Sequence, residues 1–177
     1  MKKIGILGGT FDPPHIGHLI IAEEVRLALE LEEVWFIPTY TPPHKDDAKT
    51  KAHHRIQMTE LAIESNPYFK LNPIEIERSG KSYTIETMQT LNELHPDCDF
   101  YFIIGADMVE YLPHWHRIDE LVKIVKFVGV QRSGFDLNTP YDIIKVDIPL
   151  IDISSSMLRG WLRKKRSVHY IVPESVY

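Results

Sequence analysis

The chain of 177 residues has a single cysteine, Cys98, and no long apolar run. One cysteine excludes an intramolecular disulfide and any zinc module built on cysteines. No apolar stretch approaches the roughly 20 residues that a membrane-spanning helix requires. Met1, Lys2 and Lys3 lead directly into a strand pattern, without the apolar segment of a secretory signal. We therefore expect a cytoplasmic protein that has no membrane partner.

Basic residues are also in short supply, because 20 lysines and arginines stand against 25 acidic residues and give a net charge of −5. A general nucleic-acid binder usually has a broad basic surplus, so we expect no nucleic-acid partner. Apolar residues make up 44% of the chain, which is enough for one sizeable core. Linkers and internal repeats are missing too. We therefore expect residues 1–177 to form a single domain.

Strand and helix patterns alternate along the chain. Apolar runs predict strands over residues 3–7, 33–38, 99–105, 126–131 and 143–148. Amphipathic patterns predict helices over residues 17–31, 51–65, 83–94 and 154–165. Buried strands separated by helices indicate an α/β protein with a doubly wound parallel sheet. In such a sheet a ligand binds beyond the carboxyl ends of the strands.

The first predicted strand runs directly into residues 8–18, GGTFDPPHIGH. Glycine lets a backbone approach an anion closely. The helix start that follows offers unpaired N–H groups and the positive end of a dipole. His15 and His18 are three residues apart, so one helical turn directs both imidazoles toward the same oxygens. This segment predicts a polyphosphate site, and Asp12 is expected to shape the turn by capping local N–H groups.

A second informative segment, ISSSMLR at residues 153–159, begins the last predicted helix. Serine hydroxyls at a helix start cap free N–H groups and can donate to phosphate. Arg159 follows one turn later, and a guanidinium suits a bidentate phosphate contact. Alone, the segment reads as an ordinary N-cap with a solvated arginine. Together with residues 8–18 it favours a phosphate site with two sides.

These two segments resemble the nucleotidyltransferases related to class I aminoacyl-tRNA synthetases, which pair such a histidine motif with a late ISS motif. A closer resemblance is to the bacterial nicotinate mononucleotide adenylyltransferases. Its motifs occur in order across nearly the whole chain: GGTFDPPHIGHL at 8–19, PPHK at 42–45, SYT at 82–84, GAD at 105–107 and WH at 115–116. Ser156 stands where threonine is common in that family, and it keeps the hydroxyl.

The resemblance implies a Rossmann-like nucleotidyltransferase fold and transfer of an adenylyl group from ATP to nicotinate mononucleotide. It also implies Mg²⁺ as the companion of ATP, with no metal held by protein ligands, and it suggests a homodimer. A phosphate monoester with a second pKa near ~6 is already largely dianionic at neutral pH, so the attack needs no general base. The protein's task is then to stabilise charge on the transferring and leaving groups.

The resemblance also assigns roles to individual residues. Catalytic roles fall on His15, His18, Lys45 and Arg159. ATP contacts are expected from Gly8, Gly9, Thr10, Gly105, Asp107, Ile153, Ser155 and Ser156. Contacts to nicotinate mononucleotide are expected from His44, Tyr83, Thr84, Trp115, His116 and Arg132. Among these, Trp115 would stack on the pyridine ring, and Arg132 reads equally well as a solvated residue that ends a strand.

Two alternatives stay open at this point. One is a different adenylyl- or cytidylyltransferase of the same superfamily, for instance one that acts on phosphopantetheine. Residues 42–45, 82–84 and 115–116 favour the pyridine substrate over this alternative. The other is a nucleotide-binding or metal-binding module without turnover, against which both halves of the phosphate site speak. His53 and His54 lack acidic or cysteine partners at ligand spacing, so we expect them to be solvated. Trp35 and Trp161 are expected to pack rather than to bind a ligand.

Overall fold

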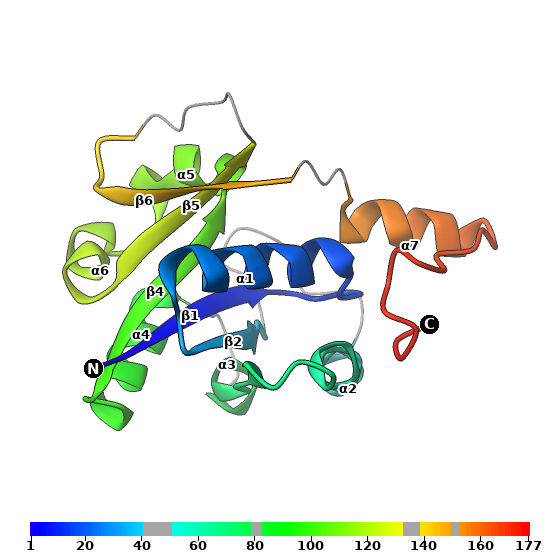
Figure 1. Cartoon of the computed structure of the whole chain (residues 1–177), viewed down its shortest axis with the longest axis horizontal. Coiled ribbons are helices and arrows are strands. Elements are labelled where there is room, and N and C mark those ends of the chain that lie inside the picture. Colours follow the sequence, from blue (N-terminus) through cyan, green and yellow to red (C-terminus); the bar gives the residue numbers. More distant parts are fainter. Residues whose placement is uncertain (41–50, 79–82, 133–138, 150–152) are drawn as a thin grey trace.

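The apolar runs of the sequence form the strands of one parallel sheet. The structure, a computed structural model, describes residues 1–40, 51–78, 83–132, 139–149 and 153–177. Six strands pair in the order β3-β2-β1-β4-β5-β6, and every pairing is parallel (Figure 1). The strands are β1 Lys2–Gly9, β2 Glu33–Pro38, β3 Phe69–Leu71, β4 Cys98–Gly105, β5 Lys126–Arg132 and β6 Ile143–Ile148. The predicted doubly wound α/β fold of Rossmann-like type is confirmed.

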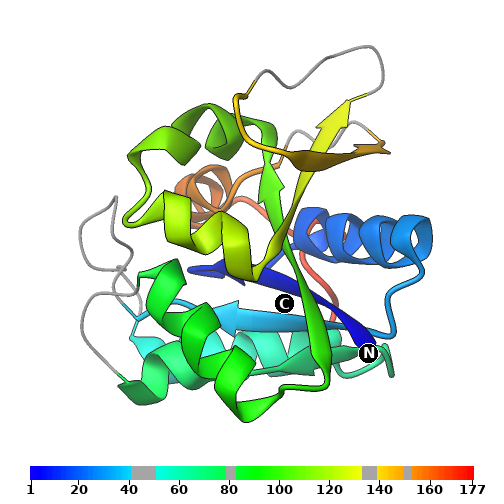
Figure 2. The ribbon, with the colours of Figure 1, turned by 90° about the vertical axis from the view of Figure 1, so that its left-hand side faces the viewer.

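Helices cover both faces of this sheet (Figure 2). They are α1 Ile16–Leu29, α2 Ala52–Ile63, α3 Ile74–Arg78, α4 Thr84–Leu94, α5 Ala106–Tyr111, the 3-10 turn η1 Leu112–His114, α6 Ile118–Ile124 and α7 Ser155–Arg163. The strand order reverses between β1 and β4, because the chain leaves β1 toward one edge and later returns to the other side of it. That reversal is the switch point at which such folds bind ligands.

Two hydrophobic cores follow from the alternation of side chains along the strands. Ile4 and Ile6 of β1 point to one face, where they join apolar residues of α4 and α6. Val34 and Phe36 of β2 point to the opposite face, where they join apolar residues of α1 and α2. Trp35 packs against the first core, as expected. The sheet is therefore buried on both sides, and its carboxyl edge is left for a site.

The end of the chain folds back on its beginning. Figure 1 shows α7 (orange) beside the start of α1, at the end of the molecule toward which β1 points. Leu158, Val168 and Val172 form a small third core, against which Trp161 packs as expected. The backbone N–H of Ile16 donates to the carbonyl of Ile171 at 2.9 Å. These contacts place the last helix next to the first turn of the fold.

The structure also differs from the expected element pattern in two places. No helix or strand is predicted over residues 106–124, yet they contain the short elements α5, η1 and α6. Pro113 lies within η1, and Arg117, in the left-handed conformation, is the N-cap of α6. In residues 69–77 apolar and polar side chains alternate only weakly, and these residues form the short strand β3 followed by α3. The content of proline and charged residues predicts a loop over residues 39–50, and residues 41–50 of it lie outside the described residues. Across the described ranges, no helix has the length and apolar character needed to span a membrane.

Candidate active site

Strands β1 and β4 are neighbours, and each ends in glycine at the carboxyl edge of the sheet. Ile6 pairs with Phe102, and each strand continues three residues further, to Gly9 and to Gly105. At Gly105 a Cβ atom would lie 3.0 Å from Oδ1 of Asp107, so glycine allows this carboxylate to stay close to the strand end. Asp107 is exposed in the first turn of α5. The structure thus brings together the predicted nucleotide-binding residues Gly8, Gly9, Gly105 and Asp107.

A buried arginine holds the turn that follows β1. Arg55 of α2 is only 1% exposed, and its Nη1 donates to the carbonyl oxygens of Thr10 at 2.9 Å and Thr39 at 2.6 Å. Burial lowers the pKa of Arg55, and the charge of Asp12 partly opposes that change. One guanidinium therefore ties the ends of β1 and β2 together beneath the predicted phosphate turn. The sequence motifs gave no sign of this residue.

His15 and His18 hold each other through the main chain. His15 is the N-cap of α1, and its Nδ1 accepts a hydrogen bond from the N–H of Gly17 at 3.1 Å. The N–H of His15 in turn donates to Nδ1 of His18 at 3.0 Å. The two rings stack with their centroids 3.8 Å apart. The pair therefore forms a capping box in which imidazoles replace the usual serine and glutamate.

This arrangement determines the protonation of both rings. Each Nδ1 accepts a backbone hydrogen bond, so it carries no proton, and the single ring proton of each neutral imidazole is on Nε2. Burial lowers the pKa of His15 to about 4. Burial, together with the nearby His15, lowers the pKa of His18 to about 3. At neutral pH both histidines are thus uncharged Nε2–H donors, unsuited to act as cations.

The serine segment of α7 binds the same turn from the other side. Ser154 caps the helix by accepting the N–H of Met157 at 3.1 Å. The Ser155 hydroxyl donates to the carbonyl of Pro13 at 2.8 Å, and Nη1 of Arg159 donates to the carbonyl of Asp12 at 2.7 Å. The same guanidinium lies 4.0 Å from the Asp12 carboxylate and donates to the Ser156 hydroxyl at 3.0 Å. The two predicted halves of the phosphate site are therefore in contact.

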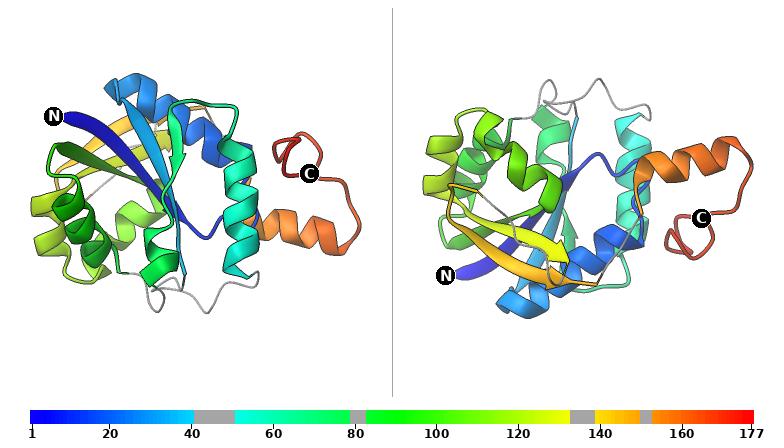
Figure 3. Two further views of the ribbon diagram at one scale, coloured as in Figure 1. Left: turned by 90° about the horizontal axis from the view of Figure 1, so that it is seen from below. Right: turned by 90° about the horizontal axis from the view of Figure 1, so that it is seen from above.

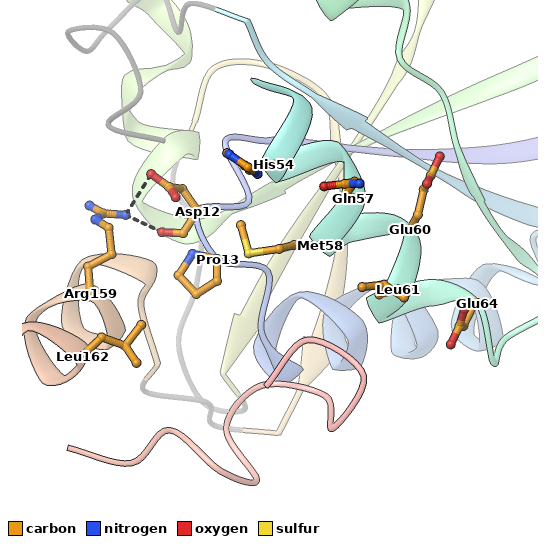
Figure 4. Close-up of a pocket in the computed structure, with 10 residues that line it drawn as sticks. All are labelled: Asp12, Pro13, His54, Gln57, Met58, Glu60, Leu61, Glu64, Arg159 and Leu162. Atoms are coloured by element: carbon orange, nitrogen blue, oxygen red, sulfur yellow. Dashed lines mark hydrogen bonds and ion pairs between the residues drawn. The ribbon is translucent and has the colours of Figure 1, made fainter. Parts of the chain in front are cut away.

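Figure 3 shows α2 and α7 next to each other. A cleft of about 770 Å³ opens between these two helices, and Arg159 is one of the residues that line it (Figure 4). Figure 4 shows the Arg159 guanidinium reaching Asp12 at the wall of this cleft. Among the predicted catalytic and binding residues that the structure describes, only Arg159 lines it. The other lining residues are Asp12, Pro13, His54, Gln57, Met58, Glu60, Leu61, Glu64 and Leu162. Since neither histidine of the pair lines this cleft, its volume does not mark the reacting centre.

Aromatic residues gather on the face of the sheet that α4 and α6 cover, and they include residues predicted to bind the pyridine ring. The rings of Tyr83 and His116 lie 4.3 Å apart between centroids. Trp115 packs edge to face on Phe102, 5.8 Å between centroids, and is half-buried against the first core. Thr84 is the first residue of α4, and the N-cap residue Tyr83 makes no side-chain hydrogen bond to the helix. The helix start is therefore not capped by its own N-cap side chain.

For the other predicted site residues the structure gives less information. His44 and Lys45 lie outside the described residues. Arg132 ends β5, and nothing further is described for its side chain. Ile153 packs against the third core beside α7, so its side chain has a structural role there. His53 and His54 are exposed on α2, and no three metal-ligating side chains converge anywhere in the part of the chain that the structure describes.

Comparison with known proteins agrees with this geometry. Residues 6–160 match the family model described as cytidylyltransferase-like. A probable nicotinate-nucleotide adenylyltransferase of Oceanobacillus iheyensis is 59% identical over 99% of this chain and 92% of its own length. The nicotinate-nucleotide adenylyltransferase of Bacillus subtilis is 49% identical over 99% of this chain and 94% of its own length.

Solved structures lead to the same family. The Plasmodium falciparum nicotinic acid mononucleotide adenylyltransferase complexed with NaAD superposes with a TM-score of 0.81 at 26% identity, covering 99% of this chain and 93% of that one. The same enzyme complexed with APC gives a TM-score of 0.79 at 25% identity, with the same coverage. The chain therefore belongs to the cytidylyltransferase-like family and, within it, to the nicotinate-nucleotide adenylyltransferases.

Proposed function

We propose that the protein transfers the adenylyl group of ATP to nicotinate mononucleotide in NAD biosynthesis. A 5′-phosphate oxygen of the mononucleotide forms a bond to the α-phosphorus, and the bond from that phosphorus to the bridging oxygen breaks. Pyrophosphate leaves, and nicotinate adenine dinucleotide forms without a covalent enzyme intermediate. The observation that carries this proposal is the contact between the histidine pair and the Arg159 segment on one turn. The names of the relatives support the same reaction.

The two histidines would stabilise the transferring phosphate as neutral donors. Their Nδ1 atoms are occupied by backbone N–H groups, so their Nε2–H groups are the atoms left for phosphate oxygens. Donors that are already oriented cost no reorganisation as charge develops in the transition state. The positive end of the α1 dipole lies at the same place. Arg159 would supply the cation for the departing pyrophosphate, and Lys45 is proposed as a second cation.

We propose that the adenosine end and the pyridine end of the product bind to different residues. Asp107, held next to Gly105, would accept hydrogen bonds from the ribose hydroxyls of ATP. The Trp115 ring would stack on the pyridine, and the uncapped start of α4 at Thr84 would bind its carboxylate. Tyr83, His116, His44 and Arg132 are proposed to complete this end. Gly8, Gly9, Thr10, Ser155 and Ser156 are proposed to line the ATP phosphates.

A divalent metal accompanies ATP in this family. The described residues provide no cluster of three acidic, histidine or cysteine ligands, so they do not form a protein cage for one. We infer that Mg²⁺ enters as the ATP complex, held by phosphate oxygens, where it neutralises part of their charge. The cytoplasmic location, the single-domain organisation and the homodimer stay predictions.

The decisive assay follows pyrophosphate release with ATP and Mg²⁺. Nicotinate mononucleotide, nicotinamide mononucleotide and phosphopantetheine are supplied separately as acceptors. We expect release with nicotinate mononucleotide and none with phosphopantetheine. Turnover with phosphopantetheine alone would support the related transferase instead. Binding of ATP without any release would support the module without turnover.

A further inference from the structure

A buried polar link joins α3 to the start of α4. The hydroxyl of Thr87 donates to Oε2 of Glu75 at 2.8 Å, and Nη2 of Arg78 donates to the same hydroxyl oxygen at 2.9 Å. Thr87 is 1% exposed and Glu75 is 7% exposed. A hydroxyl has one proton and can accept two hydrogen bonds, so a single threonine connects a buried carboxylate with a guanidinium.

This link lies one helical turn from the start of α4, where the pyridine carboxylate is proposed to bind. Thr87 follows Thr84 by three residues on the same helix, so the two side chains share one face. The Thr87 hydroxyl also lies 3.4 Å from the carbonyl oxygen of Tyr83, the N-cap residue. The network therefore contacts the turn whose backbone N–H groups would bind the carboxylate. Neither Thr87, Arg78 nor Glu75 belongs to the motifs that marked the site.

Arg78 depends on this threonine for its position. Its Nη1 atom is buried and has no hydrogen-bond partner among the described residues. The Nη2 contact with Thr87 is the described hydrogen bond of this guanidinium. Arg78 as a whole is half-buried, and leaving a buried guanidinium nitrogen without a hydrogen-bond partner costs free energy. Its positive charge adds to that of the helix start, although the Glu75 carboxylate on the same hydroxyl offsets part of it.

We propose that Thr87 and Arg78 are positioning residues that make the α4 start select a carboxylate over a carboxamide on the pyridine ring. Thr87 fixes the position of the first turn of α4 relative to α3, and Arg78 supplies positive charge near that turn. A carboxamide carries no charge, and its NH₂ group would face N–H donors. The inference rests on the proposed function, since it concerns the acceptor substrate of that reaction.

The test compares three variants of α4. Thr87→Val keeps the shape of the side chain and removes both hydrogen bonds, whereas Thr87→Ser keeps the hydroxyl. Thr90→Val is the matched control, because the Thr90 hydroxyl bonds only to the carbonyl of Glu86 in its own helix, at 3.0 Å, in the described contacts. Steady-state kinetics give kcat and KM for ATP and for both pyridine mononucleotides. Thermal unfolding shows that each variant is folded.

For Thr87→Val we expect the KM for nicotinate mononucleotide to rise about tenfold, because a displaced helix start would lose one hydrogen bond to the charged carboxylate of the substrate. The KM for ATP should change less than about twofold, and the preference for the acid over the amide should fall. Thr87→Ser and Thr90→Val should behave as the wild type. Unchanged preference in a folded Thr87→Val protein, or an equal rise in the KM for ATP, would overturn the proposal.

Arg78→Gln provides a second test if Thr87→Val does not fold. It removes the charge while leaving an amide that can donate to Thr87. The acid preference should again fall, because only the acidic substrate responds to that charge. An unchanged preference would overturn the role of Arg78. Wild-type protein that releases no pyrophosphate with either mononucleotide would refute the proposed function itself, a result distinct from any change among the variants.

Discussion

The two ends of the site are built in different ways. At the phosphate end, His15, His18, Ser155 and Arg159 are each held by a hydrogen bond to main-chain atoms of the β1–α1 region. At the pyridine end, Trp115 and Tyr83 are placed by ring packing, and the described hydrogen bonds of Thr87 lie one turn below the helix start. At the phosphate end, hydrogen bonds therefore fix the direction of each side chain. At the pyridine end, the packing of aromatic rings mainly determines the shape of the site.

That difference assigns different tasks to the two ends. Hydrogen-bond donors with a set direction suit charge that appears only in the transition state, so changes there should lower kcat. Flat aromatic surfaces suit a ring that is the same before and after reaction, so changes there should raise KM. This assignment is wrong if variants at the phosphate end raise KM without lowering kcat, or if variants at the pyridine end lower kcat without raising KM.

The largest effect is expected for His18→Ala. It removes one Nε2–H donor and the acceptor of the His15 N–H, so kcat should fall about 10²- to 10³-fold. The KM for nicotinate mononucleotide should change little. His53→Ala, at an exposed histidine of α2, is the control and should keep full turnover. Near-normal kcat in a folded His18→Ala protein would contradict a catalytic role for the pair.

Arg159→Ala should come next, with the KM for ATP raised about tenfold or more. The variant loses a charge-assisted hydrogen bond to the Asp12 carbonyl and the cation proposed for pyrophosphate. Arg163→Ala, one turn further along α7 and exposed, serves as the control. Isothermal titration with a non-hydrolysable ATP analogue measures the affinity directly. Equal weakening of both substrates would instead indicate that Arg159 only holds α7 in place.

The phosphate end should also make stability depend on pH. Because the folded pKa values of His15 and His18 lie below the ordinary 6.5, the unfolded chain binds more protons between about pH 3 and 6.5. Their contribution is complete above pH 6.5 and is lost as the pH falls toward 4. Urea unfolding at pH 7 and pH 5 should show a loss of about 1–3 kcal/mol more in the wild type than in a His15→Asn, His18→Asn variant. Identical pH slopes would mean that the pair is not held neutral.

The smallest effect is expected for Trp115→Phe. The smaller ring keeps part of the stacking surface, so the KM for nicotinate mononucleotide should rise about threefold, as typical aromatic pair energies suggest. The kcat value and the KM for ATP should stay near those of the wild type. Trp35→Phe removes an indole that packs against the same core away from the site, and it controls for lost packing. A fall in kcat alone would place Trp115 at the phosphate end instead.

Much of this architecture could be predicted from the sequence. Apolar runs gave five of the strands because a buried parallel strand needs a continuous apolar segment, as in residues 99–105. The two phosphate segments could be paired by their chemistry, although Ser155 and Pro13 are 142 residues apart. A glycine turn and a serine N-cap can be recognised from a few neighbouring residues, so they are predictable even when the chain brings them together from distant positions.

The supporting residues were harder to predict, because their roles depend on neighbours that are distant in sequence. Arg55 lies on the same helical face as Thr59 and Ala62, and this spacing was the one available signal that it is buried. Thr87 likewise shares the buried face of α4 with Met88 and Leu91. A polar residue in an apolar stripe indicates burial, but only the folded structure shows which atoms it satisfies.

The contact of α7 with the first turn has a consequence for the order of synthesis. Asp12 and Arg159 are 147 residues apart, so the histidine pair leaves the ribosome long before the arginine segment that completes the turn. A nascent chain can form β1 and α1 early, yet its phosphate site lacks one wall until α7 has been made. Affinity for ATP should therefore be acquired at the end of translation, and a ribosome-bound chain that ends before residue 153 should retain little of it.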